Sequence, residues 1–166
     1  HSTIILDNTN ISEIKGIGSF KKYPKLVEIN QFEDENFFII EGIHDGYGAK
    51  YGILTKRKIK INKTLNEVSG EDTLVSKKLI GKNKLTYSIR FHLPPAITCN
   101  LTNNKKSIIM KSKKNLVYIF ESNNELSIEN SIFIVDGSKT NQNKQIVINN
   151  IIKSIKETNY WTIRSA

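Results

Sequence analysis

Four consecutive residues, His44-Asp45-Gly46-Tyr47, bring an imidazole, a carboxylate and a phenol together in the sequence. In one interpretation Asp45 orients His44, and His44 and Tyr47 project from the rim of a sheet toward a ligand. In the other interpretation the stretch is a turn, because Gly accepts positive φ and Asp bonds to the nearby backbone. Local physical chemistry favours the turn, which would end the apolar run Phe37–Ile43.

Arg90 and His92 are a second candidate pair. They lie on the polar face of one strand-like segment, about 7 Å apart at ~3.3 Å per residue. A guanidinium beside an imidazole suits an anion such as a carboxylate or sulfate, and the alternative is an exposed polar face without a ligand. Arginine is informative here because lysine is so abundant, and it indicates bidentate geometry. The arginines are Arg57, Arg90 and Arg164, each in a strand-like segment.

Two adjacent carboxylates, Glu71 and Asp72, follow a predicted turn. Neighbouring residues in a strand point to opposite faces, so these two do not form an acid/base pair. We expect instead a charge pair with an arginine of a neighbouring strand.

Several classes of site lack their motif. The sequence has no phosphate-binding glycine loop, dinucleotide fingerprint, HExxH motif or nucleophile-elbow serine. Its three histidines, His1, His44 and His92, are too distant from one another for a local metal motif. Cys99 is the single cysteine, which excludes an internal disulfide and a Cys-based zinc site.

The formal net charge is +9, which favours a polyanionic partner such as an acidic polysaccharide, a nucleic acid or an acidic membrane surface. Lysine supplies 22 of the 25 basic residues and is dispersed, whereas nucleic-acid modules cluster arginines among aromatics. We therefore expect no nucleic-acid partner. No apolar run approaches the roughly 18 residues of a membrane span, so none is predicted.

Alternation with a period of two dominates the chain and predicts strands. In 52–62, one face carries Ile53, Thr55, Arg57, Ile59 and Ile61, and the other carries Lys56, Lys58 and Lys60. Further strands are predicted over Ser2–Leu6, Lys25–Gln31, Phe37–Ile43, Thr73–Lys77, Leu85–Leu93, Lys106–Met110, Leu116–Glu121, Ile128–Val135, Lys144–Asn149 and Tyr160–Arg164.

Turn signals separate these strands every 8 to 14 residues, which predicts an all-β fold, a two-layer antiparallel β-sandwich over 1–166 as a single domain. The signals are Asp45-Gly46, Gly81-Lys82-Asn83, Asn103-Asn104, Asn123-Asn124 and Asp136-Gly137. The isoleucines of 146–156 also fit a helical stripe, but the high β-branched content favours a strand followed by a loop.

Several segments, in order, resemble the C-terminal portion of bacterial heparinase II/III-family proteins. They are His1-Ser2-Thr3-Ile4-Ile5, Asp7–Ile14, His44–Tyr47, Gly52–Arg57, Gly70–Leu74, Arg90–Leu93, Thr140, Gln142, Gln145–Val147 and Trp161. Each motif alone is weak, and the collinear set covers nearly the whole chain. In the subgroup with this pattern a second His follows the Arg-Phe-His-Leu segment, whereas here Pro94 takes its place.

The resemblance implies a polysaccharide lyase that cleaves acidic, uronate-containing glycans by β-elimination in a bacterium, in the periplasm or the cytoplasm. Family members combine an N-terminal α/α-toroid with β-sandwich domains, and the cleft lies between them. The toroid carries the tyrosine and the Asn or Glu of the reaction. We therefore expect this chain to be the C-terminal part of a larger one, to pack against that toroid and to be inactive by itself. The alternative is a non-catalytic carbohydrate-binding or purely structural β-sandwich module.

The resemblance also suggests site residues. It places His1 where some members bind a structural zinc ion, although an N-terminal His-Ser pair is also what a purification tag leaves behind. The other zinc ligands would lie upstream, so no cofactor is expected in this chain alone. Six residues are expected to form one cluster for an acidic polysaccharide on a sheet surface: His44, Asp45, Tyr47, Arg57, Arg90 and His92. No catalytic residue is assigned.

Overall fold

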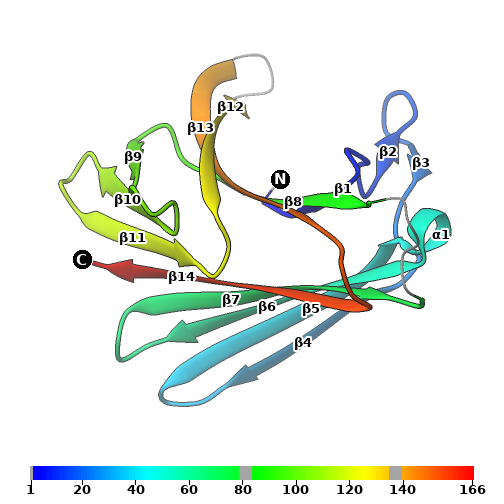
Figure 1. Ribbon diagram of the computed structural model, residues 1–166, viewed down its shortest axis with the longest axis horizontal. Coiled ribbons are helices and arrows are strands. Elements are labelled where there is room, and N and C mark those ends of the chain that lie inside the picture. The colour runs from blue at the N-terminus through cyan, green and yellow to red at the C-terminus, as the bar shows by residue number, and fades with distance from the viewer. Residues whose placement is uncertain (1, 79–83, 135–139) are drawn as a thin grey trace.

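The computed structural model describes residues 2–78, 84–134 and 140–166, and it confirms an all-β fold of antiparallel strands. Two sheets lie face to face as a sandwich, with a short hairpin and one short helix at the same end of the molecule (Figure 1). The hairpin pairs β2 (Glu13–Ile14) with β3 (Phe20–Lys22), and the helix is α1 (Gly48–Tyr51).

The larger sheet has eight strands in the order β4-β5-β6-β7-β14-β11-β10-β9. Their bounds are β4 (Val27–Glu33), β5 (Phe37–Tyr47), β6 (Ile53–Asn62), β7 (Glu67–Ser76), β14 (Lys156–Ser165), β11 (Val117–Ser122), β10 (Ser107–Ser112) and β9 (Ile97–Leu101). The C-terminal strand β14 therefore pairs with β7 and with β11, two strands distant in sequence.

The smaller sheet has four strands in the order β1-β8-β13-β12. Their bounds are β1 (Ile4–Leu6), β8 (Thr86–His92), β13 (Thr140–Ile151) and β12 (Leu126–Ile134). One face of this sheet covers the larger sheet, and the other faces outward (Figure 1).

The core lies between the sheets and follows the predicted alternation. In β8, Tyr87, Ile89 and Phe91 belong to the core, so Arg90 and His92, which alternate with them, face outward. Phe91 meets the large sheet edge-on, with its ring centre 5.0 Å from that of Trp161. Packing of aromatic rings at such distances stabilises a core beyond the area that it buries.

Gly70 makes room for the indole ring. A Cβ at this position of β7 would lie 2.1 Å from Cζ2 of Trp161. Trp161 is the partner of Gly70 on the neighbouring strand β14. The absence of a side chain at Gly70 thus lets Trp161 lie flat beneath β7, where it is 5% exposed.

Two of the predicted turns are confirmed and one is wrong. The chain turns at Asn103-Asn104 and at Asn123-Asn124. At Asp45-Gly46, however, β5 continues to Tyr47 with an irregular register, and the chain reverses through α1 and Gly52, whose φ is +67°. The predicted turns at 81–83 and 136–137 fall outside the described residues.

The ambiguous segment 146–156 is a strand followed by a loop, as predicted. Strand β13 runs to Ile151, and β14 begins at Lys156. Ile146 and Ile148 enter the core, and Val147 between them is fully buried on the opposite face of the small sheet. Among the described residues, no helix has the length and apolar character needed to cross a membrane.

Candidate functional site

The six predicted binding residues divide between the two sheets. His44, Asp45, Tyr47 and Arg57 belong to β5 and β6 of the large sheet, whereas Arg90 and His92 belong to β8 of the small sheet. Arg57 points toward the core and Arg90 points away from it, so the structure does not bring all six into one surface cluster.

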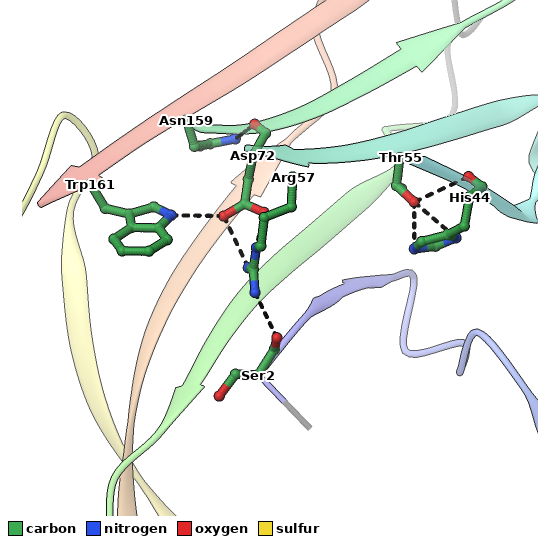
Figure 2. Close-up of polar contacts among 7 residues, drawn as sticks. All are labelled: Ser2, His44, Thr55, Arg57, Asp72, Asn159 and Trp161. Atoms are coloured by element: carbon green, nitrogen blue, oxygen red, sulfur yellow. Dashed lines mark hydrogen bonds and ion pairs between the residues drawn. The ribbon is translucent and has the colours of Figure 1, made fainter. Parts of the chain in front are cut away.

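Arg57 forms the charge pair that we expected for Asp72. Its Nε and Nη2 donate to the two carboxylate oxygens of Asp72 at 2.6 and 3.0 Å, and its Nη1 donates to the carbonyl oxygen of Ser2 at 2.6 Å (Figure 2). The indole Nε1 of Trp161 donates to the same carboxylate at 2.9 Å. Asp72 is fully buried, and the side chain of Arg57 is 21% exposed. The pair therefore ties the large sheet to the N-terminal segment within the interior.

His44 faces Thr55, a buried residue of the neighbouring strand β6. The backbone N–H of Gly46 donates to Nδ1 of His44 at 3.2 Å, which leaves the proton of a neutral ring on Nε2. That Nε2 lies 2.7 Å from Oγ1 of Thr55 (Figure 2). Burial lowers the pKa of His44 below its usual 6.5, and the nearby charge of Asp45 opposes this shift. The ring is thus held neutral inside the structure.

Asp45 anchors the start of β4. One of its carboxylate oxygens accepts the backbone N–H groups of Lys25 and Leu26 at 2.8 and 3.0 Å. These bonds favour the charged form, and the bond from Leu26 contributes most to lowering the pKa of Asp45. The carboxylate is therefore used to hold the backbone.

Tyr47 is fully buried, and its hydroxyl lies 3.0 Å from the carbonyl oxygens of both Ile4 and Thr9. Burial raises the pKa of this phenol to about 12. It anchors the N-terminal segment against β5 and keeps its proton at neutral pH.

Arg90 and His92 do share one face, as predicted, on the outside of the small sheet. Nη1 of Arg90 lies 3.1 Å from Oε2 of Glu129, and Nδ1 of His92 lies 2.8 Å from Oγ of Ser131. Both contacts run from β8 to β12 and cross over β13, which lies between those strands. Burial is the main cause that lowers the pKa of His92, and nearby positive charge, including that of Arg90, adds to it.

Gln145 of β13 lies beneath these two contacts. It is paired with His92 on one side and with Glu129 on the other, and it is only 6% exposed. Sequence reasoning did not single out Gln145 as a site residue. The sequence feature that could have indicated Gln145 is the even spacing of Asn143, Gln145 and Asn149, which places these polar residues on one face of β13.

Two adjoining hollows of about 420 and 520 Å³ extend along this outer face and share Ile5 and Arg90. We call them together the outer groove. Amide and hydroxyl side chains line the walls together with apolar surface. They include Asn8, Ser88, Asn149 and Asn150 in the first hollow and Asn130, Ser131, Gln142 and Gln145 in the second. A groove of this size that combines polar groups with an aliphatic floor suits a small polar ligand.

The zinc ion that the resemblance suggests for His1 stays a prediction, because His1 lies outside the described residues. Within residues 2–78, 84–134 and 140–166 no three His, Cys, Asp or Glu side chains come together to hold a metal ion.

Comparisons with known proteins agree with the fold and with the sequence resemblance. Residues 1–158 match the family described as heparinase II/III-like, C-terminal. No protein of curated function is similar enough in sequence to count as a relative.

Solved structures of similar fold include a heparan sulfate lyase, HepC, from Pedobacter heparinus, with a TM-score of 0.75 at 12% identity over 99% of this chain. A crystal structure of heparinase III gives a TM-score of 0.68 at 17% identity over 100% of this chain. The alignments cover 24% and 23% of those chains, so this chain spans about a quarter of their length. At such identities the likeness establishes the fold alone.

Proposed function

We propose that this chain, which belongs to the heparinase II/III-like C-terminal family, is the C-terminal β-sandwich domain of a polysaccharide lyase. The lyase cleaves acidic, uronate-containing glycans by β-elimination. The observation that carries the proposal is the family match over residues 1–158, together with a sandwich fold like that of a heparan sulfate lyase.

The role of this domain is to support and line the cleft, while the reaction takes place on groups outside it. β-Elimination requires a base for the C5 proton and an acid for the leaving oxygen. Tyr47 and His44 do not suit these tasks, because the phenol is buried with a pKa of about 12 and the half-buried imidazole is bonded to Thr55. The domain is therefore inactive by itself.

The partner domain is the N-terminal helical toroid of the same polypeptide. An apolar part of the large sheet supports this partner: Val27, Ile29 and Ile61 are 62%, 65% and 37% exposed. By register they share the face of β4–β6 that carries His44 and Thr55, beyond the cover of the small sheet. Uncovered apolar surface of this kind marks an interface.

An acidic glycan is the substrate class that the charge of the domain favours. The net charge of +9 attracts polyanions and raises their local concentration. The outer groove adds a place where one of the three arginines meets amides and hydroxyls. The glycan therefore contacts this domain chiefly through Arg90 and its neighbours.

The test is to incubate two proteins with heparan sulfate and with a neutral glucan: residues 1–166 alone, and the full-length polypeptide that contains them. Ultraviolet absorbance of the unsaturated uronate follows the elimination. We expect the product only from the full-length protein with the acidic glycan. A full-length protein that forms no unsaturated product from any uronate glycan would contradict the proposal.

A further inference from the structure

We propose that the outer groove binds one uronate unit of the glycan, with Arg90 holding its carboxylate and Gln145 accepting a hydrogen bond from a neighbouring hydroxyl. The inference rests on the proposed function for the kind of ligand, and on the geometry of the groove for the residues. It assigns a binding role to Gln145 and places a sugar subsite on the outside of the small sheet.

Gln145 presents an unsatisfied acceptor. Its Nε2 lies 3.4 Å from both Oε2 of Glu129 and the backbone oxygen of Asn130, while its Oε1 has no hydrogen-bond partner within the described part of the chain. Rotating the amide by half a turn would not help, because Oε1 would then face those two acceptors. Buried acceptors in native proteins normally have a partner. Oε1 is enclosed, but Gln145 lines the second hollow, so a small rotation of its side chain would bring this acceptor within reach of a ligand hydroxyl.

Arg90 lines the same hollow as Gln145 and presents donors there. Nη1 contacts Glu129, whereas Nε is buried without a partner among the described residues, and the side chain as a whole is 22% exposed. The guanidinium is therefore partly accessible and is held in place by its ion pair with Glu129. A fixed, planar set of N–H groups matches a carboxylate in two-point geometry.

The spacing of these groups corresponds to a sugar acid. Arg90 and Gln145 belong to adjacent strands, face the same side and lie two residues apart along the ladder, because Gln145 pairs with His92 and Val147 pairs with Arg90. A single sugar ring can carry an anion and a hydroxyl at a diagonal separation of about 7–8 Å. Ile5 borders both hollows and offers an aliphatic surface to the C–H groups of that ring, while the amides along the walls meet its other hydroxyls.

The groove favours a glycan over a protein partner because amide and hydroxyl side chains lie beside aliphatic surface along it, as a sugar ring with its hydroxyls and C–H groups requires. Protein docking surfaces have an apolar centre, which in this domain lies on the large sheet at Val27 and Ile29.

The experiment is isothermal titration calorimetry of residues 1–166 with a heparan sulfate hexasaccharide, with its carboxyl-reduced form and with its desulfated form. We expect Arg90→Gln to weaken binding of the natural hexasaccharide about 10- to 100-fold, the range for a charge-assisted hydrogen bond. Gln145→Met should weaken it about fivefold, as for one neutral hydrogen bond. Carboxyl reduction should cancel the effect of Arg90→Gln, whereas desulfation should not.

Arg164→Gln is the matched control, because Arg164 also pairs with a glutamate across strands, at 3.3 Å from Glu121, but on the large sheet. It should leave the affinity within about twofold. Thermal unfolding of each variant identifies any that fail to fold, and Asn149→Ala then replaces the failed variant as a second probe of the groove wall.

Equal weakening by Arg90→Gln and Arg164→Gln would mean unspecific attraction by charge and would overturn the subsite. So would a sensitivity that follows sulfate instead of carboxylate, or the absence of any binding of the hexasaccharide. In these cases a full-length protein that still forms unsaturated product keeps the proposed lyase function, so the two failures are distinguishable.

Discussion

Asp72 is the residue on which the polar interior of this domain depends. Its buried carboxylate accepts hydrogen bonds from Arg57 and from the indole of Trp161. Breaking one side of such a buried pair is costly, because the remaining charge keeps its desolvation penalty without its partner.

We predict that Asp72→Asn lowers the free energy of unfolding by about 3–5 kcal/mol, the usual cost of leaving a buried charge unpaired. Urea unfolding monitored by circular dichroism measures this change. The control is Glu121→Gln in the exposed pair with Arg164, where a loss of about 0–1 kcal/mol is expected. Equal losses in the two variants would show that Asp72 contributes no more than a surface charge.

His44 gives the stability a dependence on pH. Its folded pKa lies below the usual 6.5, so the unfolded chain takes up the proton first as the pH falls. The free energy of unfolding should therefore decrease as the pH drops below about 6.5, and His44→Gln should flatten this slope. His92→Gln should change it less, because His92 is largely exposed. A slope that is unchanged in His44→Gln would contradict a half-buried ring that is kept neutral.

The charge pair of Asp72 with an arginine was predictable, whereas the single binding cluster was not confirmed. The reason is which side chains of each strand alternate toward the core. Arg57 alternates in phase with Ile53 and Ile59, which enter or pack against the core, so its position on an inner face was visible in the sequence. Arg90 alternates out of phase with the core residues of β8 and is therefore on the outside.

At the scale of elements, the packing of β7 against β14 depends on the close contact between Gly70 and the indole of Trp161. Trp161 is stacked on Phe120, with an interplanar angle of 10°, and meets Phe91 edge-on. The ring has little freedom to move away from a new side chain at Gly70.

We predict that Gly70→Ala lowers the free energy of unfolding by about 1–3 kcal/mol through overpacking. Gly42→Ala is the control, because Gly42 also lies in a strand but a Cβ added there would meet open space, with no atom of the described residues within 4 Å. Thermal unfolding of both variants checks this. A Gly70→Ala protein as stable as Gly42→Ala would refute the close fit.

The end of β5 shows why the turn at Asp45-Gly46 was wrongly predicted. The Asp45 carboxylate bonds to the backbone of a distant segment, at Lys25 and Leu26. A Cβ on Gly46 would lie 2.7 Å from Cγ2 of Ile11, so this glycine serves close packing, and the positive φ is adopted by Gly52. Local turn chemistry contains no information on these long-range contacts.

At the scale of the whole molecule, the period of two was enough to predict a sandwich, because each strand reveals its own buried face. The order of strands was not predictable in this way, since it depends on pairings such as β7 with β14 and β1 with β8. The outer groove is assembled from β1, β8, β12 and β13. The role of Gln145 in it could not be predicted, because it depends on the partners of Gln145 on β8 and β12.

The central claim is that this domain contributes glycan binding to a lyase whose chemistry lies elsewhere. A residue that binds substrate and transition state equally changes KM and leaves kcat unaltered. In the proposed subsite Arg90 is in that position, because it would contact the uronate without taking part in proton transfer.

The most direct test is the steady-state kinetics of the full-length lyase on heparan sulfate, with Arg90→Gln compared with Arg164→Gln. The account predicts a KM raised about tenfold or more in Arg90→Gln with kcat retained, and no change in Arg164→Gln. A loss confined to kcat, or kinetics that are the same in both variants, would contradict it.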